Sequence, residues 1–384
     1  MTDHRRLLVT GGAGFIGVNF VLHAIENLDV TIVVLDALTY AGNVASLESV
    51  LGAPNCEFVH GDILDRELVD RLLADHDIDT IVHFAAESHV DRSIHGPEAF
   101  VRTNILGTHV LLEAARARWL GTPFPASGRE ARFHHVSTDE VYGSLAADAP
   151  PSVESDPYEP NSPYSASKAG SDHLVRAYHH TYGLPVTTSN CSNNFGPYQF
   201  PEKLIPLMIT RALQGGTLPV YGDGLHRRDW LYVEDHVRGI GLVLESGRVG
   251  VTYNIGGENE WANLDLVQLL CRVIDAAFED DRSLAERFPE APPARGGNCA
   301  DLVTFVEDRL GHDRRYSLNV DTARKELGYA PEPDFQHLLT RTVAWYIENE
   351  GWWRGILDGS YREWLETNYG SVVAGADANS KEAD

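Results

Sequence analysis

A glycine-rich segment near the start of the chain constrains its fold more than any other feature. Residues 10–17 read TGGAGFIG and lie between a short apolar run, 7–10, and a stretch with helical periodicity, 15–27. Glycines at 11, 14 and 17 allow a tight turn and let the backbone approach a pyrophosphate, which then rests on the helix N-terminus. The order of strand, glycine turn and helix predicts the start of a dinucleotide-binding sheet.

The first half of the chain continues this alternation. Apolar, β-rich runs occupy residues 7–10, 31–35, 57–60, 80–84 and 133–137. Stretches with helical periodicity lie between or after them, at 15–27, 66–75, 99–118 and 164–182. Runs that are apolar nearly throughout suit strands buried on both faces of a parallel sheet. We therefore predict an α/β fold with a Rossmann-type, doubly wound parallel sheet.

Asp36 ends the second predicted strand, 19 residues after Gly17. A carboxylate at this position accepts hydrogen bonds from both ribose hydroxyls and repels a 2′-phosphate, so it favours NAD over NADP. Asp62 follows the third strand, and the segment 84–88 follows the fourth. Ligands bind beyond the carboxyl ends of parallel strands, so these residues are predicted to line the same site. The alternative for Asp62 is to cap the helix that begins near Asp65.

The alternation becomes irregular after about residue 190, where loops rich in Asn, Gly and Pro separate shorter elements. The predicted division is an NAD-binding Rossmann domain over 1–190 with return segments near 226–256, a smaller α+β substrate domain over 191–225 and 257–368, and a disordered tail over 369–384. Residues 279–301 are expected to form a surface excursion.

The composition excludes several classes of function. A net charge of −25 argues against nucleic acid or an anionic membrane as partner. No apolar run is long enough to span a bilayer, and the start of the chain leads straight into a strand, so we expect neither a membrane segment nor a secretion signal. The four cysteines form no C-x-x-C pair, which is typical of a reducing compartment, and we expect a cytoplasmic protein. The histidines show no ligand spacing, so we predict no metal site.

A tyrosine and a lysine lie one helical turn apart, at Tyr164 and Lys168. Ser162 is a predicted N-cap and Pro163 a predicted first helical residue, so the pair lies in the first turns of its helix. A phenol with a pKa near 10 serves as a base at neutral pH only if that pKa falls by roughly three units. A lysine ammonium and an oxidised nicotinamide ring would both act in that direction. The alternative is a surface tyrosine beside a solvated lysine.

The segment 137–143, STDEVYG, follows the fifth predicted strand. Thr138 can donate a hydrogen bond to a substrate hydroxyl. Asp139 and Glu140 are adjacent carboxyls, and two such groups in one cleft tend to divide into an acid and a base, as removal of water beside a ketone requires. Neighbours on a regular strand face opposite sides, so both reach one substrate only if the chain leaves strand geometry at Asp139. The alternative is a solvated acidic loop.

These motifs resemble those of the dTDP-glucose 4,6-dehydratases, in the extended short-chain dehydrogenase/reductase superfamily. The resemblance rests on TGGAGFIG, DALTYAGN (36–43), GDI (61–63), HFAAESHVDRS (83–93), STDEVYG, PYSASKAGSDH (163–173), NCSNNFGPYQFPEK (190–203), RRDWLYVEDH (227–236) and VEDRLGHDRRY (306–316). It runs from about residue 5 to about residue 350. The motifs are dense and occur in one order, which makes the match more specific than either half alone.

The resemblance implies a redox-neutral cycle on dTDP-glucose. Tyr164, assisted by Thr138 and Lys168, would take the proton of the 4-hydroxyl while hydride passes from carbon 4 to NAD. Glu140 would remove the carbon-5 proton, and Asp139 would protonate the departing 6-hydroxyl. Hydride returned to carbon 6 gives dTDP-4-keto-6-deoxyglucose.

The resemblance also implies the residues of two binding sites. The predicted cofactor contacts are Gly11, Gly14, Phe15, Ile16, Gly17, Asp36, Leu38, Thr39, Asp62, Ile63, Phe84, Ala85, Ala86, Ser88, Thr103, Tyr164, Lys168 and Asn190. The predicted substrate contacts are Ser88, Thr138, Asn193, Lys203, Leu204, Pro219, Tyr221, Arg228, Asn263, Arg309, His312 and Tyr316. The arginines would meet the diphosphate by forked hydrogen bonds. Leu310 stands where the family often has proline. The family is commonly homodimeric, through helices near 99–118 and 164–182.

Three other functions stay open on the residues alone. A nucleotide-sugar 4-epimerase or decarboxylase would share Tyr164, Lys168 and the glycine turn, but an epimerase needs no acid such as Asp139 for a leaving hydroxyl. A non-catalytic NAD-binding regulatory protein would need none of the reactive residues. A GDP-mannose or CDP-glucose dehydratase would run the same chemistry on another base.

Overall fold

The computed structural model describes residues 4–121 and 130–359, so the predicted tail over 369–384 lies outside the described residues. The sheet at its centre has seven strands in the order β10-β6-β5-β4-β1-β2-β3, all parallel. Their bounds are β1 (Arg5–Thr10), β2 (Val30–Asp36), β3 (Cys56–His60), β4 (Thr80–His83), β5 (Arg132–Thr138), β6 (Val186–Cys191) and β10 (Thr252–Ile255). The predicted Rossmann-type sheet is confirmed.

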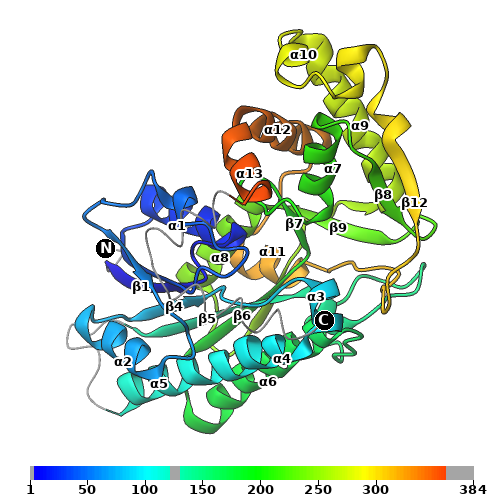
Figure 1. Cartoon of the computed structure of the whole chain (residues 1–384). Coiled ribbons are helices and arrows are strands. Elements are labelled where there is room, and N and C mark those ends of the chain that lie inside the picture. The colour runs from blue at the N-terminus through cyan, green and yellow to red at the C-terminus, as the bar shows by residue number, and fades with distance from the viewer. Residues whose placement is uncertain (1–3, 122–129, 360–384) are drawn as a thin grey trace.

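Helices cover both faces of this sheet (Figure 1). α1 (Phe15–Asn27) and α8 (Val233–Ser246) pack on one face with Leu7 and Val9 of β1. α2 (Arg66–Asp75), α5 (Thr108–Leu120) and α6 (Pro163–Tyr182) pack on the other face with Leu8. Successive side chains of a strand point to opposite faces, so a continuous apolar run supplies both layers of core.

The single helix expected over 99–118 is three segments in the structure. α4 (Pro97–Phe100) leads into a wide-turned π-helical segment, η2 (Val101–Gly107), before α5 begins. Asn104 in this segment is buried and bonds both backbone groups of Glu87, at 2.9 and 3.0 Å. Wide turns inside helices are frequent at functional sites, and this one fixes the loop after β4.

The second half of the chain builds a smaller lobe. It holds a three-stranded sheet of β7 (Asn193–Phe195), β9 (Arg227–Tyr232) and β11 (Glu260–Ala262), and a pair formed by β8 (Leu218–Tyr221) and β12 (Val303–Val306). Around them lie α7 (Leu204–Leu213), α9 (Asn263–Asp280), α12 (Phe335–Glu348) and α13 (Glu350–Leu357). α8 and β10 return to the first sheet, whereas β9 does not.

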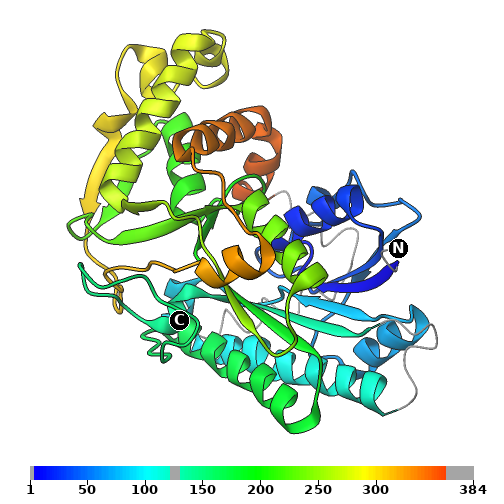
Figure 2. The ribbon, with the colours of Figure 1, turned by 180° about the vertical axis from the view of Figure 1, so that it is seen from behind.

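Two further segments complete the fold. α11 (Asp321–Leu327) packs with β10 where the large sheet meets the second lobe, as the view from behind shows (Figure 2). Residues 279–301, expected to be a surface excursion, fold into α10 (Leu284–Arg287), η4 (Pro292–Arg295) and η5 (Cys299–Leu302). Leu284 and Phe288 of this segment are buried in the hydrophobic core of the second lobe. Among the helices so described, none is long and apolar enough to cross a membrane.

Candidate active site

Two adjoining cavities lie at the carboxyl ends of the parallel strands. The first has a volume of about 330 Å³ and the second about 220 Å³. Residues that line both are Ser88, Glu140, Asn193, Asn194, Gln199, Glu202 and Lys203. The edge where both cavities lie is the edge at which open α/β sheets bind ligands.

The glycine turn forms the floor of the first cavity. Gly11 has a φ of +71°, and a Cβ there would lie 2.5 Å from the backbone nitrogen of Ala85. A Cβ on Gly17 would overlap the carbonyl oxygen of Gly11 and lie 2.7 Å from the Cα of Gly12. The backbone is therefore packed as closely as only glycine allows, with the N-terminus of α1 at the cavity wall.

Replacing Gly17 by alanine is expected to destabilise the protein by about 1–3 kcal/mol, because the added methyl forces the turn away from α1. The same displacement should lower the amount of NAD that copurifies with the protein. Thermal unfolding and cofactor content after gel filtration measure both effects. Gly241→Ala is the matched control, since its Cβ would meet nothing closer than 4.0 Å inside α8. Equal cofactor content in the two variants would contradict the role of the turn.

Asp36 is buried at the end of β2, on the wall of the first cavity. Its two carboxylate oxygens accept backbone N–H groups, one from Leu38 at 2.8 Å and one from Ala13 at 2.9 Å. Burial raises the pKa of Asp36, and these two hydrogen bonds oppose that rise. A carboxylate accepts about four hydrogen bonds, so capacity remains for a ribose. The glycine turn and Asp36 fit an NAD molecule.

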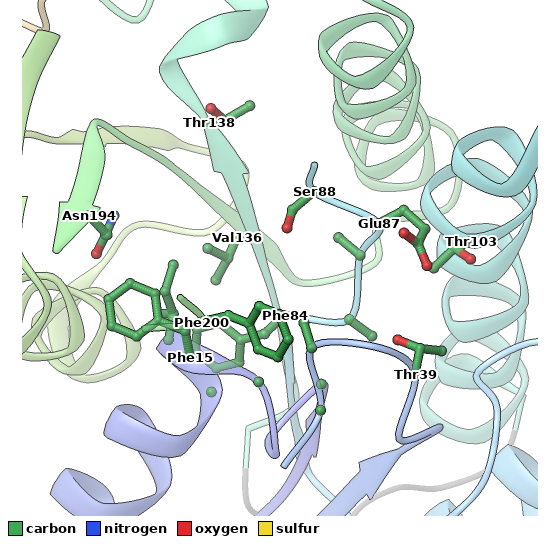
Figure 3. Close-up of a pocket in the computed structure, with 18 of the residues that line it drawn as sticks. Phe15, Thr39, Phe84, Glu87, Ser88, Thr103, Val136, Thr138, Asn194 and Phe200 are labelled. Atoms are coloured by element: carbon green, nitrogen blue, oxygen red, sulfur yellow. The ribbon is translucent and has the colours of Figure 1, made fainter. Parts of the chain in front are cut away.

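Other predicted cofactor residues also line the first cavity. They are Gly11, Gly14, Phe15, Ile16, Thr39, Asp62, Ile63, Phe84, Ala85, Ala86, Ser88 and Thr103. Figure 3 shows Phe15 and Phe84 at one end and Thr138 at the other. The N-cap of α2 is Asp65, which accepts the N–H of Leu68 at 3.0 Å, so the alternative role of Asp62 as that cap is wrong.

The strand β5 ends just before Asp139, as it must if Asp139 and Glu140 are to reach the same cavity. β5 ends at Thr138, and Asp139 begins a 3-10 turn, η3 (Asp139–Tyr142). The Thr138 hydroxyl accepts the N–H of Glu140 at 3.3 Å and closes this turn. Both Asp139 and Glu140 line the first cavity, and Asp139 is only 3% exposed. The alternative of a solvated acidic loop is therefore wrong.

The two acids have different electrostatic surroundings. Burial raises the pKa of Asp139 well above its ordinary value, and the charges of Glu140 and Asp229 add to the rise. Burial also raises the pKa of Glu140, but Arg309, Arg228 and Lys203 oppose it. Asp139 thus holds a proton more firmly than Glu140. This separation suits an acid and a base that act on one substrate.

Tyr164 and Lys168 are both buried on the wall of the first cavity. Ser162 caps their helix, accepting the N–H of Ser165 at 3.0 Å, and Pro163 is the first helical residue, as predicted. The Lys168 ammonium donates to the carbonyl of Val136 at 2.9 Å. The alternative of a surface tyrosine beside a solvated lysine is wrong.

The pKa of Tyr164 is not lowered by the chain alone. Burial raises it well above its ordinary value, and the charge of Glu140 adds to the rise, while a hydrogen bond from Thr138 opposes it. Burial lowers the pKa of Lys168, and Asp172 opposes that change. The phenol is therefore neutral until further positive charge enters the cavity.

The second cavity gathers three cations in a strongly acidic protein. Lys203, Arg228 and Arg309 line it. The Arg228 guanidinium donates to the carbonyls of Arg227 and Asp313, at 2.7 and 2.8 Å, which fixes its plane. Other predicted substrate residues on this wall are Ser88, Asn193, Leu204, Pro219, Tyr221, Asn263 and His312. A fixed guanidinium group beside a second arginine and an ammonium suits a diphosphate.

Three predicted residues do not line either cavity. Leu38 is buried beneath its turn, with a φ of +50°, and contributes its N–H to Asp36. Asn190 is fully buried in β6 and donates to the Tyr142 hydroxyl at 2.8 Å. Tyr316 packs under Arg228, whose guanidinium carbon lies 4.4 Å from the ring centroid. Leu38 and Tyr316 thus support Asp36 and Arg228, which line the site, whereas Asn190 bonds Tyr142, which lines neither cavity.

His226, Asp308 and His312 bring possible ligand atoms within 4.8 Å of one another. The two imidazoles stack at 3.7 Å, and Asp308 accepts from His312 at 2.6 Å. Burial lowers the pKa of both histidines, and Arg228 adds to that fall, together with Arg314 at His226 and Arg309 at His312, while Asp308 opposes it. The same positive charge opposes a cation, so the prediction of no metal is kept.

Sequence reasoning missed several residues of the cavity walls. Those that line the first cavity include Tyr40, Glu87, Asn194, Gln199, Phe200 and Glu202. The last four belong to a motif that the sequence singles out, 190–203, but no periodicity indicates which of its side chains face inward. Tyr40 belongs to the segment 36–43 and Glu87 to the segment 83–93, which the sequence also singles out.

A cofactor cavity with a buried tyrosine–lysine pair on its wall, adjoining a cationic cavity, is typical of an extended short-chain dehydrogenase/reductase. A family model described as GDP-mannose 4,6 dehydratase matches residues 8–342. A dTDP-glucose 4,6-dehydratase of Xanthomonas campestris pv. campestris (strain B100) is 54% identical over 92% of this chain and 97% of its own length. The chain belongs to the dTDP-glucose 4,6-dehydratase family.

Solved structures agree with this assignment. A dTDP-glucose 4,6-dehydratase from Streptomyces venezuelae, solved with NAD and TYD bound, is 49% identical, with a TM-score of 0.79 over 91% of this chain and 99% of that chain. A UDP-glucuronic acid 4-epimerase from Bacillus cereus is 25% identical, with a TM-score of 0.75 over 90% of this chain and 99% of that chain. Epimerases therefore share the fold at a much lower identity.

Proposed function

We propose that this chain is an NAD-dependent hydro-lyase that converts dTDP-glucose into dTDP-4-keto-6-deoxyglucose. The observation that carries the proposal is the pair Asp139 and Glu140, which line one cavity with Tyr164 and differ in how firmly each holds a proton. An epimerase needs no acid for a leaving hydroxyl, and a regulatory protein needs none of these groups. Relatives named for this reaction, at 52–54% identity, support the choice of substrate.

The first step concerns the 4-hydroxyl of the sugar. Bound NAD would accept a hydride from carbon 4 and bring positive charge next to the tyrosine. It would later return the hydride to carbon 6 while the protonated Glu140, in exchange with solvent, gives a proton back to carbon 5. Tyr164 takes the hydroxyl proton, for which its buried phenol must ionise. Lys168 stabilises the phenolate by its charge, and Thr138 by a hydrogen bond. The result is a ketone at carbon 4.

The second step removes water across carbons 5 and 6. The ketone acidifies the hydrogen on carbon 5, which Glu140 takes as a base. Asp139, whose pKa is raised well above its ordinary value, gives its proton to the departing 6-hydroxyl. Lys203, Arg228 and Arg309 hold the diphosphate, so the sugar stays oriented toward both acids.

The finer assignments follow the same observations. We propose that the large sheet carries NAD and the second lobe carries the nucleotide, along the predicted domain division. We also propose a cytoplasmic homodimer. Val101 and Leu106 of η2 are each 47% exposed beside α6, and such an apolar surface suits an interface formed by the α5 and α6 helices of two subunits.

The reaction is tested by incubating the protein with dTDP-glucose in deuterium oxide, with no added reductant. We expect a product that has lost one water and carries one solvent deuterium on carbon 5, located by NMR. The hydrogen that arrives on carbon 6 should come from carbon 4 of the same sugar. An isomer of unchanged composition would indicate an epimerase. Turnover of another nucleotide sugar, but not of dTDP-glucose, would overturn the choice of base.

A further inference from the structure

The segment between β7 and α7 runs along both cavities. Gln199, Glu202 and Lys203 line the two of them, and Phe200 lines the first. We call residues 196–203 the strap. Figure 3 shows Phe200 of the strap and Thr39, which follows β2, on opposite sides of the view of the cavity.

The second lobe holds the strap from one side. The Tyr346 hydroxyl donates to the carbonyl of Gln199. The ring of Tyr198 lies 4.8 Å from that of Trp345 and 5.9 Å from that of Trp352. Tyr198 itself has a φ of +65°, which a non-glycine residue keeps only where its surroundings enforce it. The strap is thus anchored on α12 and α13.

The loop after β2 holds the strap from the other side. Tyr40 and Glu202 both line the first cavity, and the Tyr40 hydroxyl lies near enough to the Glu202 carboxylate for a hydrogen bond between them to lower the pKa of Glu202. The Tyr40 ring lies 5.7 Å from the ring of Phe200, edge to face, and Arg92 of α3 (Val90–His95) stands 3.9 Å over its centre. We call Tyr40, Arg92 and Glu202 the clasp. It joins the loop that begins at Asp36 to the strap.

Burial strengthens the bond at the centre of the clasp. Burial raises the pKa of both Tyr40 and Glu202, whereas the charges of Lys203 and Arg92 favour the ionised Glu202. A hydrogen bond to an ionised carboxylate is roughly twice as strong as a neutral one. The other oxygen of Glu202, Oε1, is buried without a hydrogen-bond partner in the described part of the chain. It is available to a ligand in the cavity.

We propose that the clasp is a gate that retains NAD between the two hydride transfers. Asp36 is the predicted ribose partner, and the clasp connects its loop to the strap across the first cavity, so the cofactor leaves only when the clasp opens. The inference rests on the proposed function, in which the hydride taken from carbon 4 must return to carbon 6. If NADH leaves the protein between the two hydride transfers, the hydride leaves with it. The sugar then remains a ketone at carbon 4 and is not reduced at carbon 6.

The gate is tested by exchange of bound NAD against labelled NAD, in the full-length protein and without any sugar. We expect Tyr40→Phe, which removes the hydrogen bond to a charged group, to accelerate exchange about tenfold to a hundredfold. Glu202→Gln keeps an acceptor but loses the charge, so it should accelerate exchange by a smaller factor that still exceeds about twofold. Tyr253→Phe is the matched control, because it removes a tyrosine–glutamate hydrogen bond of 2.9 Å, to Glu326, away from both cavities. Arg92→Met, an exposed position, is the reserve if Tyr40→Phe does not fold.

A second measurement follows the variants with dTDP-glucose. We expect free NADH to appear, one molecule for each sugar that remains unreduced at carbon 6, and added NAD to sustain the reaction. If bound NAD exchanges in both Tyr40→Phe and Glu202→Gln at a rate within twofold of that of the unmodified protein, the proposed gate is wrong. If exchange accelerates but the unmodified protein does not dehydrate dTDP-glucose, the gate stands and the proposed function fails.

Discussion

Replacing Tyr164 by phenylalanine is expected to lower kcat for dTDP-glucose by roughly 10²–10⁴-fold. The variant loses the only group on the cavity wall that we assign to the 4-hydroxyl proton, so no ketone forms and neither later step begins. Bound cofactor should stay oxidised, which the absorbance of reduced nicotinamide reports after mixing with substrate. The fold should be kept, because the ring still packs against Phe100, whose centroid is 6.3 Å away.

Tyr182→Phe is the control for this prediction. It makes the same change at the far end of α6, where the side chain is 48% exposed. We expect its kcat to equal that of the unmodified protein. If the kcat of Tyr164→Phe stays within tenfold of that value and reduced cofactor still forms, another group accepts the 4-hydroxyl proton. That outcome would contradict the role assigned to Tyr164.

The fold could be predicted from the sequence because its main signal is local. α1 and α2 begin and end at the predicted residues, and five strands match to within two residues at each end. A strand buried on both faces has a continuous apolar run, and a glycine turn marks the first crossover. The prediction of a single helix over 99–118 was wrong because a wide turn changes the path of the backbone without changing the hydrophobic pattern of the sequence. Asn104, which fills that turn, contacts residues far away in sequence.

The first cavity could be predicted in large part for a topological reason. The carboxyl ends of parallel strands meet at one edge, so residues after β1, β2, β4 and β5 lie together. Asn190 shows the limit of that argument. Its side chain faces Tyr142 inside the protein, and the next two residues, Cys191 and Ser192, line the cavity instead. Side chains alternate along a strand, so an error of one residue selects the wrong face.

The strap and the clasp could not be predicted from local patterns. Tyr40 and Glu202 are far apart in the chain, and neither belongs to a helix or strand. Their contact depends on how α12 and α13 seat Tyr198, which is a property of the packed second lobe. The cations of the second cavity came from family resemblance alone, because no spacing relates Lys203, Arg228 and Arg309.

Replacing Glu140 by glutamine is expected to separate oxidation from dehydration. Tyr164 and Lys168 remain, so the 4-hydroxyl is oxidised and reduced cofactor accumulates on the protein. Without its base the elimination should slow by roughly 10²–10⁴-fold, and no deuterium should enter carbon 5 from deuterium oxide. The same change removes a negative charge that raises the pKa of Asp139, so the acid also loses its proton more readily.

Asp139→Asn distinguishes the two acids. Glu140 is still present in that variant, so carbon 5 should exchange with solvent deuterium in the oxidised sugar while the 6-hydroxyl fails to leave. Glu326→Gln, an exposed surface carboxyl, should behave as the unmodified protein. If the hydrogen on carbon 5 still exchanges with solvent deuterium in Glu140→Gln but not in Asp139→Asn, then Asp139 is the base and Glu140 is the acid. The raised pKa of Asp139 argues against that outcome, because a carboxyl that keeps its proton cannot take another from carbon.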